Sequence, residues 1–318
     1  MRILDQADTA RSLSFPPLID AISQMFTSGC VMPVRHHHTI EVPGERDATL
    51  LLMPAWRPGA YMGVKLVSVF PDNHVRSLPA IHGSYLLSSG KTGELLAVID
   101  GGELTARRTA ATSALAARHL ARADASTLLV VGTGRLSLNL IEAHSQVRPI
   151  EKVMVWGREF SKAQAVVAEA RGLGYAAEAV SDLEAAARSA DILSCATLSH
   201  APLVLGAWLK PGSHLDLVGA FRKDMRESDD EAVKRASLFV DTRAGAFAEA
   251  GDLLQPLEAG VITPADIKAE LVELVSGTAP GRQSSGEITL FKSVGAALED
   301  LAGAILAYET VSVGHIPT

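Results

Sequence analysis

The sequence has little cysteine, no long apolar run and no cluster of positive charge, and each shortage excludes a class of protein. Its 318 residues include only two cysteines, Cys30 and Cys195, which argues against a disulfide scaffold and for a reducing compartment. No stretch of about 18 uncharged apolar residues occurs, so no membrane-spanning helix is expected. The net charge is −7 and no block of Lys and Arg stands out, which argues against nucleic acid as a partner.

The first residues also lack the pattern of a targeting signal. Residues 1–13 have no long apolar core and no cleavage-like site, so we expect a cytoplasmic protein. Apolar residues make up 47% of the chain and charged residues 20%, as in ordinary folded proteins. Because 318 residues exceed one typical hydrophobic core, the length indicates two domains.

The first third of the chain predicts one helix followed by a sheet. Residues 15–26 place apolar side chains at helical spacing, with two prolines in the first turn. Short apolar runs separated by Pro, Gly, Asn and Asp then predict an antiparallel-leaning sheet. These runs are 49–53, 61–70, 83–87 and 94–100, with a hairpin turn at 90–93.

The pattern changes after a long alanine-rich helix predicted at 103–120. From residue 126 onwards, strands alternate with helices, which predicts a parallel sheet covered on both faces and thus an α/β fold. The predicted strands are 126–131, 152–156, 175–180, 191–196, 213–218 and 238–241. A last helical stretch at 293–311 is expected to pack back onto the first domain.

A glycine-rich turn follows the first of these strands. The apolar run 127–131 leads into Gly132, Thr133, Gly134, Arg135 and Leu136. The first glycine permits the turn, the second lets the backbone approach a pyrophosphate, and the following helix N-terminus presents free N–H groups. The small residue that comes next, a serine, allows close helix–strand packing. Such a turn can be purely structural, but its position between a strand and a helix favours dinucleotide binding by these five residues.

The end of the second strand bears on which dinucleotide is bound. NAD enzymes usually place Asp or Glu there to hold the ribose 2′-hydroxyl. Here Arg158 stands at this point and Lys162 follows, and both can bind a 2′-phosphate. Glu159 could instead serve as the acidic residue, and Arg158 could be a solvated loop charge. The sequence therefore predicts NADPH, with NADH as an alternative.

Short segments spread along the chain match the pattern of a known family. They are 32–35, 63–67, 95–101, 105–111, 132–134, 209–214, 218–220 and 290–295. Through them the chain resembles the ornithine cyclodeaminase/mu-crystallin family along nearly its whole length. The resemblance implies a Rossmann dinucleotide-binding domain, residues 121–292, inserted into an α+β substrate-binding and dimerisation domain, residues 1–120 with 293–318. It also implies a homodimer that forms through the sheet of the first domain.

One position separates two chemistries within this family. Cyclodeaminases carry an Asp two residues after a Val-Gly pair that closes a late Rossmann strand, and Phe221 stands there in this chain. A phenyl ring cannot accept a proton. The segment 219–227 is more similar to the ketimine reductases, including Δ1-pyrroline-2-carboxylate reductases, which use NADPH or NADH. The resemblance thus implies NADPH-dependent reduction of Δ1-pyrroline-2-carboxylate to L-proline, with Δ1-piperideine-2-carboxylate, which would give L-pipecolate, as a second candidate.

Three other functions stay open at this stage. An ornithine cyclodeaminase would be an NAD-dependent lyase that forms proline and ammonia. An alanine-type amino-acid dehydrogenase would turn over a linear 2-oxo acid with ammonia. A non-catalytic, NADPH-linked ligand-binding protein would bind the coenzyme without turning over an imine.

A cyclic imine carboxylate needs cations for its carboxylate and a proton on its C=N bond. Arg35, Lys65 and Arg108 are the candidates, by resemblance and by residue type. Lys65 lies in an apolar run, where an unpaired charge is unfavourable. It could bind the carboxylate or protonate the imine nitrogen, or it could face water at a strand edge. Arg108 could form a bidentate clamp, and its neighbour Arg107 could take that role instead.

Several further residues are predicted to lie at the site. His82 is a candidate catalytic residue, although the family's His aligns one position away. Arg222 is predicted to bind the substrate. Thr197 is predicted to contact the cofactor because it follows the strand 191–196, and cofactors bind at the carboxyl edge of open α/β sheets. The resemblance implies cofactor contacts for Gly219, Ser293 and Val294.

No metal is predicted. Of the three consecutive histidines, only His36 and His38 can share a strand face, and no Cys or acidic residue has the spacing of a zinc site. Cys195 is expected to be a buried strand residue without catalytic function. Glu299 and Asp300 are expected to be solvated or helix-capping charges.

Overall fold

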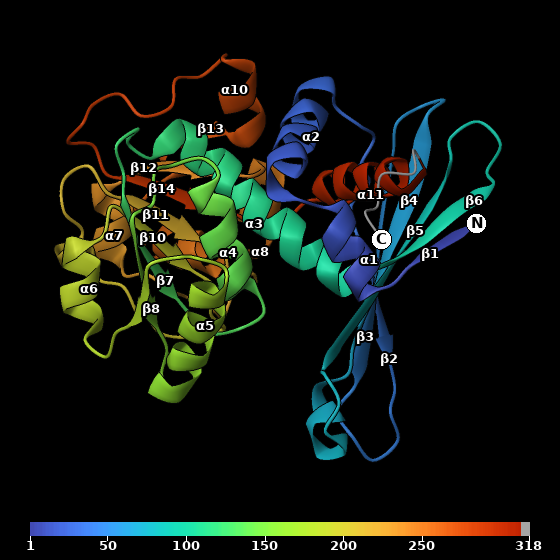
Figure 1. The fold of residues 1–318 in the computed structure, drawn as a ribbon, viewed down its shortest axis with the longest axis horizontal. Helices are drawn as coiled ribbons and strands as arrows, with labels where there is room; N and C mark the ends of the chain where they lie inside the picture. Colours follow the sequence, from blue (N-terminus) through green and yellow to red (C-terminus); the bar gives the residue numbers. More distant parts are fainter. Residues whose placement is uncertain (313–318) are drawn as a thin grey trace. The chain divides into compact units, whose positions relative to one another are not determined.

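The computed structural model describes residues 1–312 and divides the chain into two compact units (Figure 1). The first unit comprises residues 1–108 and the segment that begins at Ala297; the second comprises Thr109–Ala296. Both ends of the chain therefore contribute to the first unit. The divisions fall at 108/109 and 296/297, whereas the sequence predicts them at 120/121 and 292/293. Residues 313–318 of the predicted first domain lie outside the described residues.

A six-stranded sheet forms the centre of the first unit, in the order β1-β6-β5-β4-β3-β2. Strands β2 to β6 pair antiparallel and β1 joins β6 in parallel, so the predicted antiparallel sheet is confirmed. The turn predicted at 90–93 connects β5 to β6, where Gly93 adopts a φ of 74°. The strands are β1 (Arg2–Leu4), β2 (His36–Ile40), β3 (Ala48–Trp56), β4 (Tyr61–Val69), β5 (Ile81–Ser89) and β6 (Leu95–Asp100).

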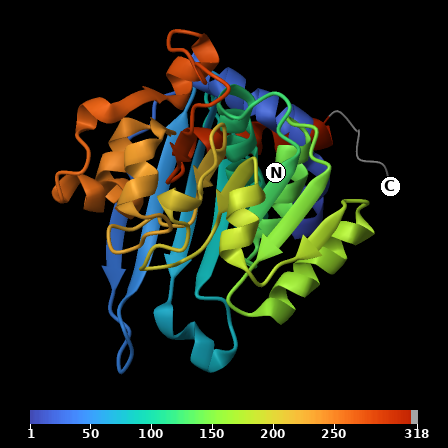
Figure 2. The same cartoon turned by 90° about the vertical axis from the view of Figure 1, so that its left-hand side faces the viewer.

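One face of this sheet is covered by helices. Helix α11 (Ala297–Ser312) contacts β3, β4, β5 and β6, and it packs against α1 (Gln6–Ser12) and α2 (Phe15–Ser28). Helix α2 buries the predicted apolar stripe that includes Leu18, Ile19 and Ile22. Figure 2 shows the long strands of this unit, with the 3₁₀ turn η1 (Pro71–Arg76) beyond the ends of β4 and β5.

The second unit contains a parallel sheet of eight strands in the order β13-β12-β14-β11-β10-β7-β8-β9. The predicted Rossmann-type α/β fold is therefore confirmed. Two of its strands, β13 and β14, were not predicted from the sequence. The strands are β7 (Thr127–Val131), β8 (Lys152–Trp156), β9 (Ala177–Ala179), β10 (Ile192–Cys195), β11 (His214–Leu217), β12 (Ser237–Val240), β13 (Ile267–Glu270) and β14 (Thr289–Lys292).

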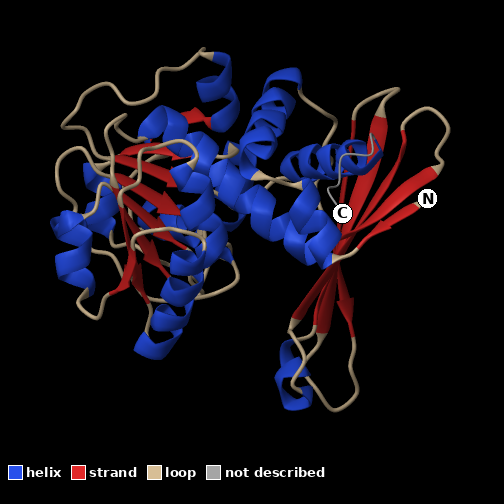
Figure 3. Cartoon of the chain, viewed as in Figure 1, coloured by secondary structure: helices blue, strands red, loops and turns tan. Residues whose placement is uncertain are grey.

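Both faces of this parallel sheet are buried. Along β7, Leu129 and Val131 pack into one apolar cluster, whereas Leu128 and Val130 pack into another. Because alternate side chains point to opposite faces, two cores require helices on both sides, as Figure 3 shows. The remaining helices are α3 (Gly101–Leu120), α4 (Leu136–Ser145), α5 (Phe160–Gly172), α6 (Leu183–Ser189), α7 (Asp230–Arg235), α8 (Arg243–Glu249), α9 (Gly251–Glu258) and α10 (Leu271–Ser276), with 3₁₀ turns η2 (Gly206–Trp208) and η3 (Pro264–Asp266). No helix within residues 1–312 combines the length and apolar character needed to span a bilayer.

Candidate active site

A buried cluster of charges lies in the first unit, where β4 meets the start of α11. The Lys65 side chain is almost fully buried, and its Nζ lies 2.7 Å from Asp300 Oδ2. Arg108, near the middle of α3, places its Nε 2.9 Å from Asp300 Oδ1 and its Nη1 2.5 Å from Glu299 Oε2. Asp300 therefore bridges two of the predicted cations, and Lys65 does not face water.

Strand alternation explains why Lys65 points inward. It pairs across the sheet with Met53 on β3 and Tyr85 on β5, and all three side chains are buried on one face. Two residues earlier in β4, a Cβ on Gly63 would lie 2.3 Å from the Tyr85 hydroxyl oxygen, so only glycine fits beneath that ring. The face of β4 that carries Lys65 is thus closely packed.

The expectation for Glu299 and Asp300 was wrong. Both carboxyl groups are fully buried in the first turn of α11, rather than solvated. Helix α11 is buried along almost its whole length, so its first turn has no face towards water. Buried carboxylates are unfavourable unless they are paired or hydrogen-bonded, and here Lys65 and Arg108 supply the partners.

The charges of this cluster shift one another's pKa values. Burial lowers the pKa of Lys65 to about 8, because desolvation disfavours the charged form. The negative charge of Asp300 raises this pKa but does not outweigh desolvation, and the Arg108 and Arg35 cations lower it further. Burial raises the pKa of Asp300, but Arg108, Lys65 and Arg35 outweigh this and hold it below the ordinary value. Near neutral pH, Lys65 is therefore a cation that can release its proton within a moderate pH range.

The structure brings the three predicted cations together. Arg35 is half-buried just before β2 and is close enough to Lys65 and Asp300 to shift the pKa of both. Arg107 instead donates to Glu103 Oε1 at 3.0 Å, and its guanidinium lies 5.2 Å from the centroid of the Phe15 ring. Of the two adjacent arginines, Arg108 is the one that joins the charge cluster.

Two further predicted site residues are His82 in the first unit and Arg222 in the second. His82 is exposed and pairs with Ser68 on β4; since it is three residues before Tyr85, it points to the face opposite Lys65. The family's His aligns one position away, and a shift of one residue reverses the face. Arg222, in the second unit, is exposed and its guanidinium binds Asp224 at 2.7–2.9 Å. The structure therefore does not join His82 to the charge cluster.

The glycine-rich turn of the second unit has the shape that a dinucleotide requires. Gly132 adopts a φ of 129°, and a Cβ there would lie 2.7 Å from the Ala196 carbonyl oxygen. A Cβ on Gly134 would meet nothing within 4 Å, so the backbone there is open to approach. The buried Ser137 hydroxyl donates to the Gly132 carbonyl oxygen at 2.9 Å and holds the turn against α4. The residues present thus fit a bound pyrophosphate.

Other residues predicted to bind the dinucleotide lie at the turn and beyond the end of β8. Thr133 and Arg135 lie between Val131, the last residue of β7, and Leu136, the first residue of α4. Arg158 is exposed just beyond β8. Lys162, in the first turn of α5, lies 2.7 Å from Glu159 Oε1.

The carboxyl edge of the parallel sheet holds the other predicted cofactor residues. Thr197 follows β10, Gly219 follows β11, and Ser293 and Val294 follow β14. Two buried carboxylates, which the sequence analysis missed, bind the backbone of these loops. Glu227 accepts hydrogen bonds from the amides of Thr197 (2.6 Å) and Gly219 (2.7 Å). Asp241 accepts hydrogen bonds from the amides of Val294 and Gly295, both at 2.8 Å.

Asp241 carries a sequence signal that was available, because it is an acidic residue at the end of the predicted strand 238–241. Glu227 lies in a polar loop and has no comparable signal.

Beside this edge, Phe221 follows Gly219 and Ala220, and 38% of its surface is exposed. The position that distinguishes cyclodeaminases thus carries no carboxylate in the folded chain.

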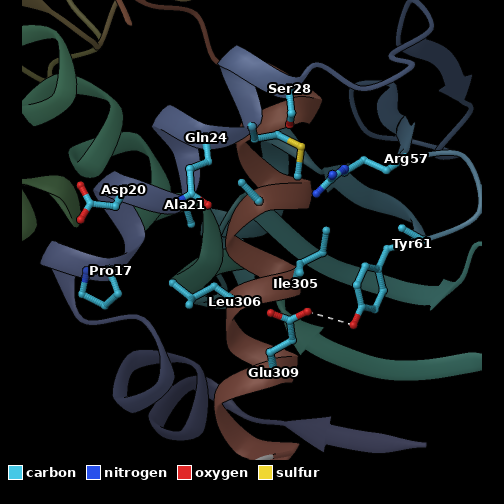
Figure 4. Close-up of a pocket in the computed structure, with 13 residues that line it drawn as sticks. Pro17, Asp20, Ala21, Gln24, Ser28, Arg57, Tyr61, Ile305, Leu306 and Glu309 are labelled. Carbon is cyan, nitrogen blue, oxygen red and sulfur yellow. Dashed lines mark hydrogen bonds between the residues drawn. The ribbon is translucent and has the colours of Figure 1, made fainter.

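A separate cavity of about 470 Å³ lies within the first unit (Figure 4). Its walls come from α2, α11 and the start of β4, and Tyr61 donates from its hydroxyl to Glu309 Oε1 at 3.0 Å. Arg57 is its cationic residue. The three cations of the charge cluster do not line it, so it is distinct from the candidate site.

Cys195, His36 and His38 behave as the sequence predicts in their burial and in the face that they occupy. Burial raises the pKa of Cys195 far above its ordinary value, so its thiol stays protonated. His36 and His38 share a face as predicted, with ring centroids 6.3 Å apart. Residues 1–312 contain no group of three or more His, Cys, Asp or Glu side chains arranged to hold a metal ion.

A parallel sheet with a glycine turn after its first strand defines the Rossmann class of dinucleotide-binding proteins, here joined to an antiparallel unit that holds a buried charge cluster. The chain belongs to the ornithine cyclodeaminase/mu-crystallin family, whose model matches residues 3–315. The resemblance inferred from the sequence segments is therefore confirmed.

Three similar proteins illustrate this membership. The chain is 40% identical over 303 residues to a Δ1-pyrroline-2-carboxylate reductase of Paracoccus denitrificans, covering 92% of this chain and 96% of the relative. Its fold is similar to that of the Thermococcus litoralis Δ1-pyrroline-2-carboxylate reductase in complex with NADH and L-proline (TM-score 0.91, 35% identity, 99% and 98% covered). It is also similar to an archaeal alanine dehydrogenase dimer with bound NAD (TM-score 0.89, 30% identity, 100% and 98% covered).

Proposed function

We propose that this protein is an NADPH-dependent reductase of cyclic ketimine carboxylates that converts Δ1-pyrroline-2-carboxylate to L-proline. Δ1-Piperideine-2-carboxylate, which would give L-pipecolate, is the second candidate substrate. The observation that carries the proposal is the buried cluster in which Lys65 and Arg108 share Asp300, with Arg35 nearby. Relatives named as reductases of this imine, at 40% and 35% identity, support the choice of substrate.

The charge cluster suits an anionic imine. Lys65 and Arg108 contact Asp300 and Arg35 is close to it, so a substrate carboxylate would meet three cations there. Arg35 and Arg108 bind that carboxylate, and Lys65 donates a proton from Nζ to the imine nitrogen. A lysine with a pKa of about 8 is still protonated at neutral pH and is closer to the ideal for a proton donor than an ordinary lysine. Asp300 holds Nζ in position.

The coenzyme would be held by the second unit and would supply the hydride. The turn from Gly132 to Leu136 binds the pyrophosphate, and Arg158 with Lys162 binds the 2′-phosphate. The loops that carry Thr197, Gly219, Ser293 and Val294 hold the nicotinamide end. Because a protonated imine carries positive charge that hydride addition cancels, protonation by Lys65 lowers the barrier to reduction.

A panel of reductions tests the proposal directly. Purified protein should oxidise NADPH with Δ1-pyrroline-2-carboxylate or Δ1-piperideine-2-carboxylate, and should do so more efficiently than with NADH. Pyruvate with ammonia tests for an alanine-type dehydrogenase, and ornithine tests for a cyclodeaminase. Release of ammonia from ornithine, or NADPH binding without turnover of either imine, would contradict the proposal.

Arg158→Ala is expected to raise the KM for NADPH by about 10- to 100-fold and to leave the KM for NADH nearly unchanged. The reason is that charge-assisted hydrogen bonds to a phosphate contribute about 1.5–3 kcal/mol. Steady-state kinetics with both coenzymes measure the effect. Lys162→Ala is the matched variant, and a smaller loss is expected because Lys162 is already paired with Glu159. An equal loss for both coenzymes would remove Arg158 from the 2′-phosphate site.

The same proposal includes a homodimer that forms through the sheet of the first unit. The face of this sheet opposite Lys65 carries half-buried Val64 and Leu66 on β4 and Leu86 on β5, with Met62 41% exposed at its edge. An apolar sheet face of this kind favours a partner over water. The similar archaeal alanine dehydrogenase is described as a dimer.

The proposal also includes a cytoplasmic location. The two free cysteines, Cys30 and Cys195, support it, because cysteines stay reduced in that compartment.

Leu66→Asp should convert the dimer to a monomer, because a carboxylate cannot be buried without a partner at the centre of an apolar interface. Light scattering coupled to size exclusion measures the mass. Leu173→Asp, at an exposed position after α5 in the second unit, is the control and should remain dimeric. A native chain that is already monomeric, or a Leu66 variant that stays dimeric, would argue against this interface.

A further inference from the structure

Glu227 is a fully buried carboxylate whose two oxygens bind two different loops. Oε1 accepts hydrogen bonds from the Thr197 amide at 2.6 Å and from the Thr197 hydroxyl at 2.7 Å. Oε2 accepts from the Gly219 amide at 2.7 Å and from the Ala220 amide at 3.3 Å. One side chain therefore satisfies four donors at the ends of the adjacent strands β10 and β11.

The two loops are held at a distance that only glycine allows. A Cβ on Gly219 would lie 2.0 Å from the Thr197 carbonyl oxygen and 2.6 Å from Glu227 Oε1. The same segment touches the phosphate turn, because a Cβ on Gly132 would lie 2.7 Å from the Ala196 carbonyl oxygen. Displacement of the Thr197 loop would therefore disturb the glycine turn as well.

Glu227 is in turn held from behind by other buried charges. Asp252, in α9, accepts hydrogen bonds at Oδ1 from the amides of Glu227 (2.8 Å) and Ser228 (3.1 Å). Its Oδ2 lies 3.3 Å from Nζ of Lys292, the last residue of β14. All of these side chains are fully buried. Buried charges of this kind seldom increase stability over an apolar core, so their retention favours a role in geometry.

We propose that Glu227 is a positioning residue for the coenzyme, which fixes the loops after β10 and β11 against each other and against the phosphate turn. Ligands of open parallel sheets bind outside the carboxyl ends of the strands, where these loops lie. The inference rests on the proposed function only in that a dinucleotide occupies this edge. The effect on the loops themselves is independent of it.

The environment of Glu227 links loop order to pH. Burial raises its pKa to about 7; Lys292 on β14 opposes the rise, Asp252 on α9 adds to it, and the hydrogen bonds from Thr197 oppose it. The Cys195 thiol at the end of β10 is also near. A protonated carboxyl group presents one O–H donor and cannot accept from all four groups. The loops should therefore loosen as the pH falls below about 7.

Glu227→Gln tests the proposal, because its amide NH₂ cannot accept a hydrogen bond and one of the two loops loses its acceptor. In coenzyme-free protein, hydrogen exchange of the amides of Thr197, Gly219 and Ala220 should rise about tenfold or more. NADPH binding, measured as a Kd by calorimetry, should weaken about tenfold. The Kd of the native protein should rise below pH 7, whereas that of the variant should stay high and flat.

Asp216→Asn is the matched control. Asp216 is equally buried in the same sheet, on β11, but its oxygens accept from the hydroxyls of Ser113 and Ser194 rather than from the strand-end loops. This variant should lose stability without a change in loop exchange or coenzyme Kd. If Glu227→Gln does not fold, Thr197→Val removes the hydroxyl from one oxygen alone and should give a smaller change of the same kind.

The outcomes separate this inference from the proposed function. Unchanged exchange and Kd in Glu227→Gln would overturn it, as would equal changes in Asp216→Asn, which would indicate general destabilisation. If loop exchange is faster in Glu227→Gln but the native chain binds no dinucleotide, the coenzyme role and the proposed function are overturned. The loop contacts of Glu227 would still be supported. Faster exchange with weaker NADPH binding supports the inference even if the imine substrate proves to be different.

Discussion

Lys65→Met is expected to abolish imine reduction, with a fall in kcat/KM of about 10³-fold or more. The variant removes the proton donor and one of the three cations that face the substrate carboxylate, and each role contributes about 10²-fold or more in comparable sites. Methionine has a similar length and fills the buried space beside Tyr85. Steady-state oxidation of NADPH with Δ1-pyrroline-2-carboxylate measures the loss.

Two controls separate chemistry from folding in this variant. The Kd for NADPH should be unchanged, because the glycine turn lies in the second unit and Lys65 lies in the first. In the native enzyme, kcat/KM should fall as the pH rises through about 8, because Lys65 loses its proton there. Lys65→Arg keeps the charge but does not titrate near pH 8, so in this variant the fall should move to higher pH. Native turnover in Lys65→Met would rule out both proposed roles of the lysine.

Arg108→Met is expected to have the largest effect on stability, a loss of about 3–5 kcal/mol in the free energy of unfolding. It leaves Glu299 without its 2.5 Å contact and Asp300 with Lys65 as its close cationic partner. Removal of one member of a buried charge network is unfavourable because the remaining charge stays desolvated. Urea unfolding followed by circular dichroism measures the change.

Arg107→Met is the matched control for that experiment. It removes the neighbouring arginine, whose contacts with Glu103 and the Phe15 ring lie outside the charge cluster. A smaller loss than in Arg108→Met is expected, because Arg107 contacts one carboxylate rather than two, and the KM for the imine should be unchanged. If the two variants behaved alike, the assignment of Arg108 rather than Arg107 to the substrate would be wrong.

The fold was largely predictable because its patterns are local. Strand–helix alternation after residue 126 and the glycine turn at Gly132 predicted the parallel sheet, and Gly- and Pro-bounded apolar runs predicted the antiparallel one. Strands β13 and β14 were missed because each is short and, unlike the equally short β10, β11 and β12, neither was recognised as part of the strand–helix alternation. Helix α3 crosses the division at Arg108, which periodicity cannot reveal since the helix is continuous there.

The site was only half predictable, because charge type is local whereas pairing is not. Residue type and the family resemblance selected Arg35, Lys65 and Arg108, which lie near one another in the structure, while their contact with a substrate stays a prediction. Glu299 and Asp300 were misjudged, since their partners Lys65 and Arg108 lie about two hundred residues away in sequence. His82 was misplaced by the alternation of a single strand. Glu227 was missed because its burial depends on loops from two other strands.

The pleat of β4 also restricts how the length of this chain can vary over evolution. Between Gly63, which must pass beneath Tyr85, and Lys65 there is one residue, Val64, that points the other way. A single insertion or deletion between them would carry the lysine to the apolar side and leave Asp300 without this cationic partner. Related sequences should therefore show gaps in the turn at 90–93 and never between positions 63 and 65.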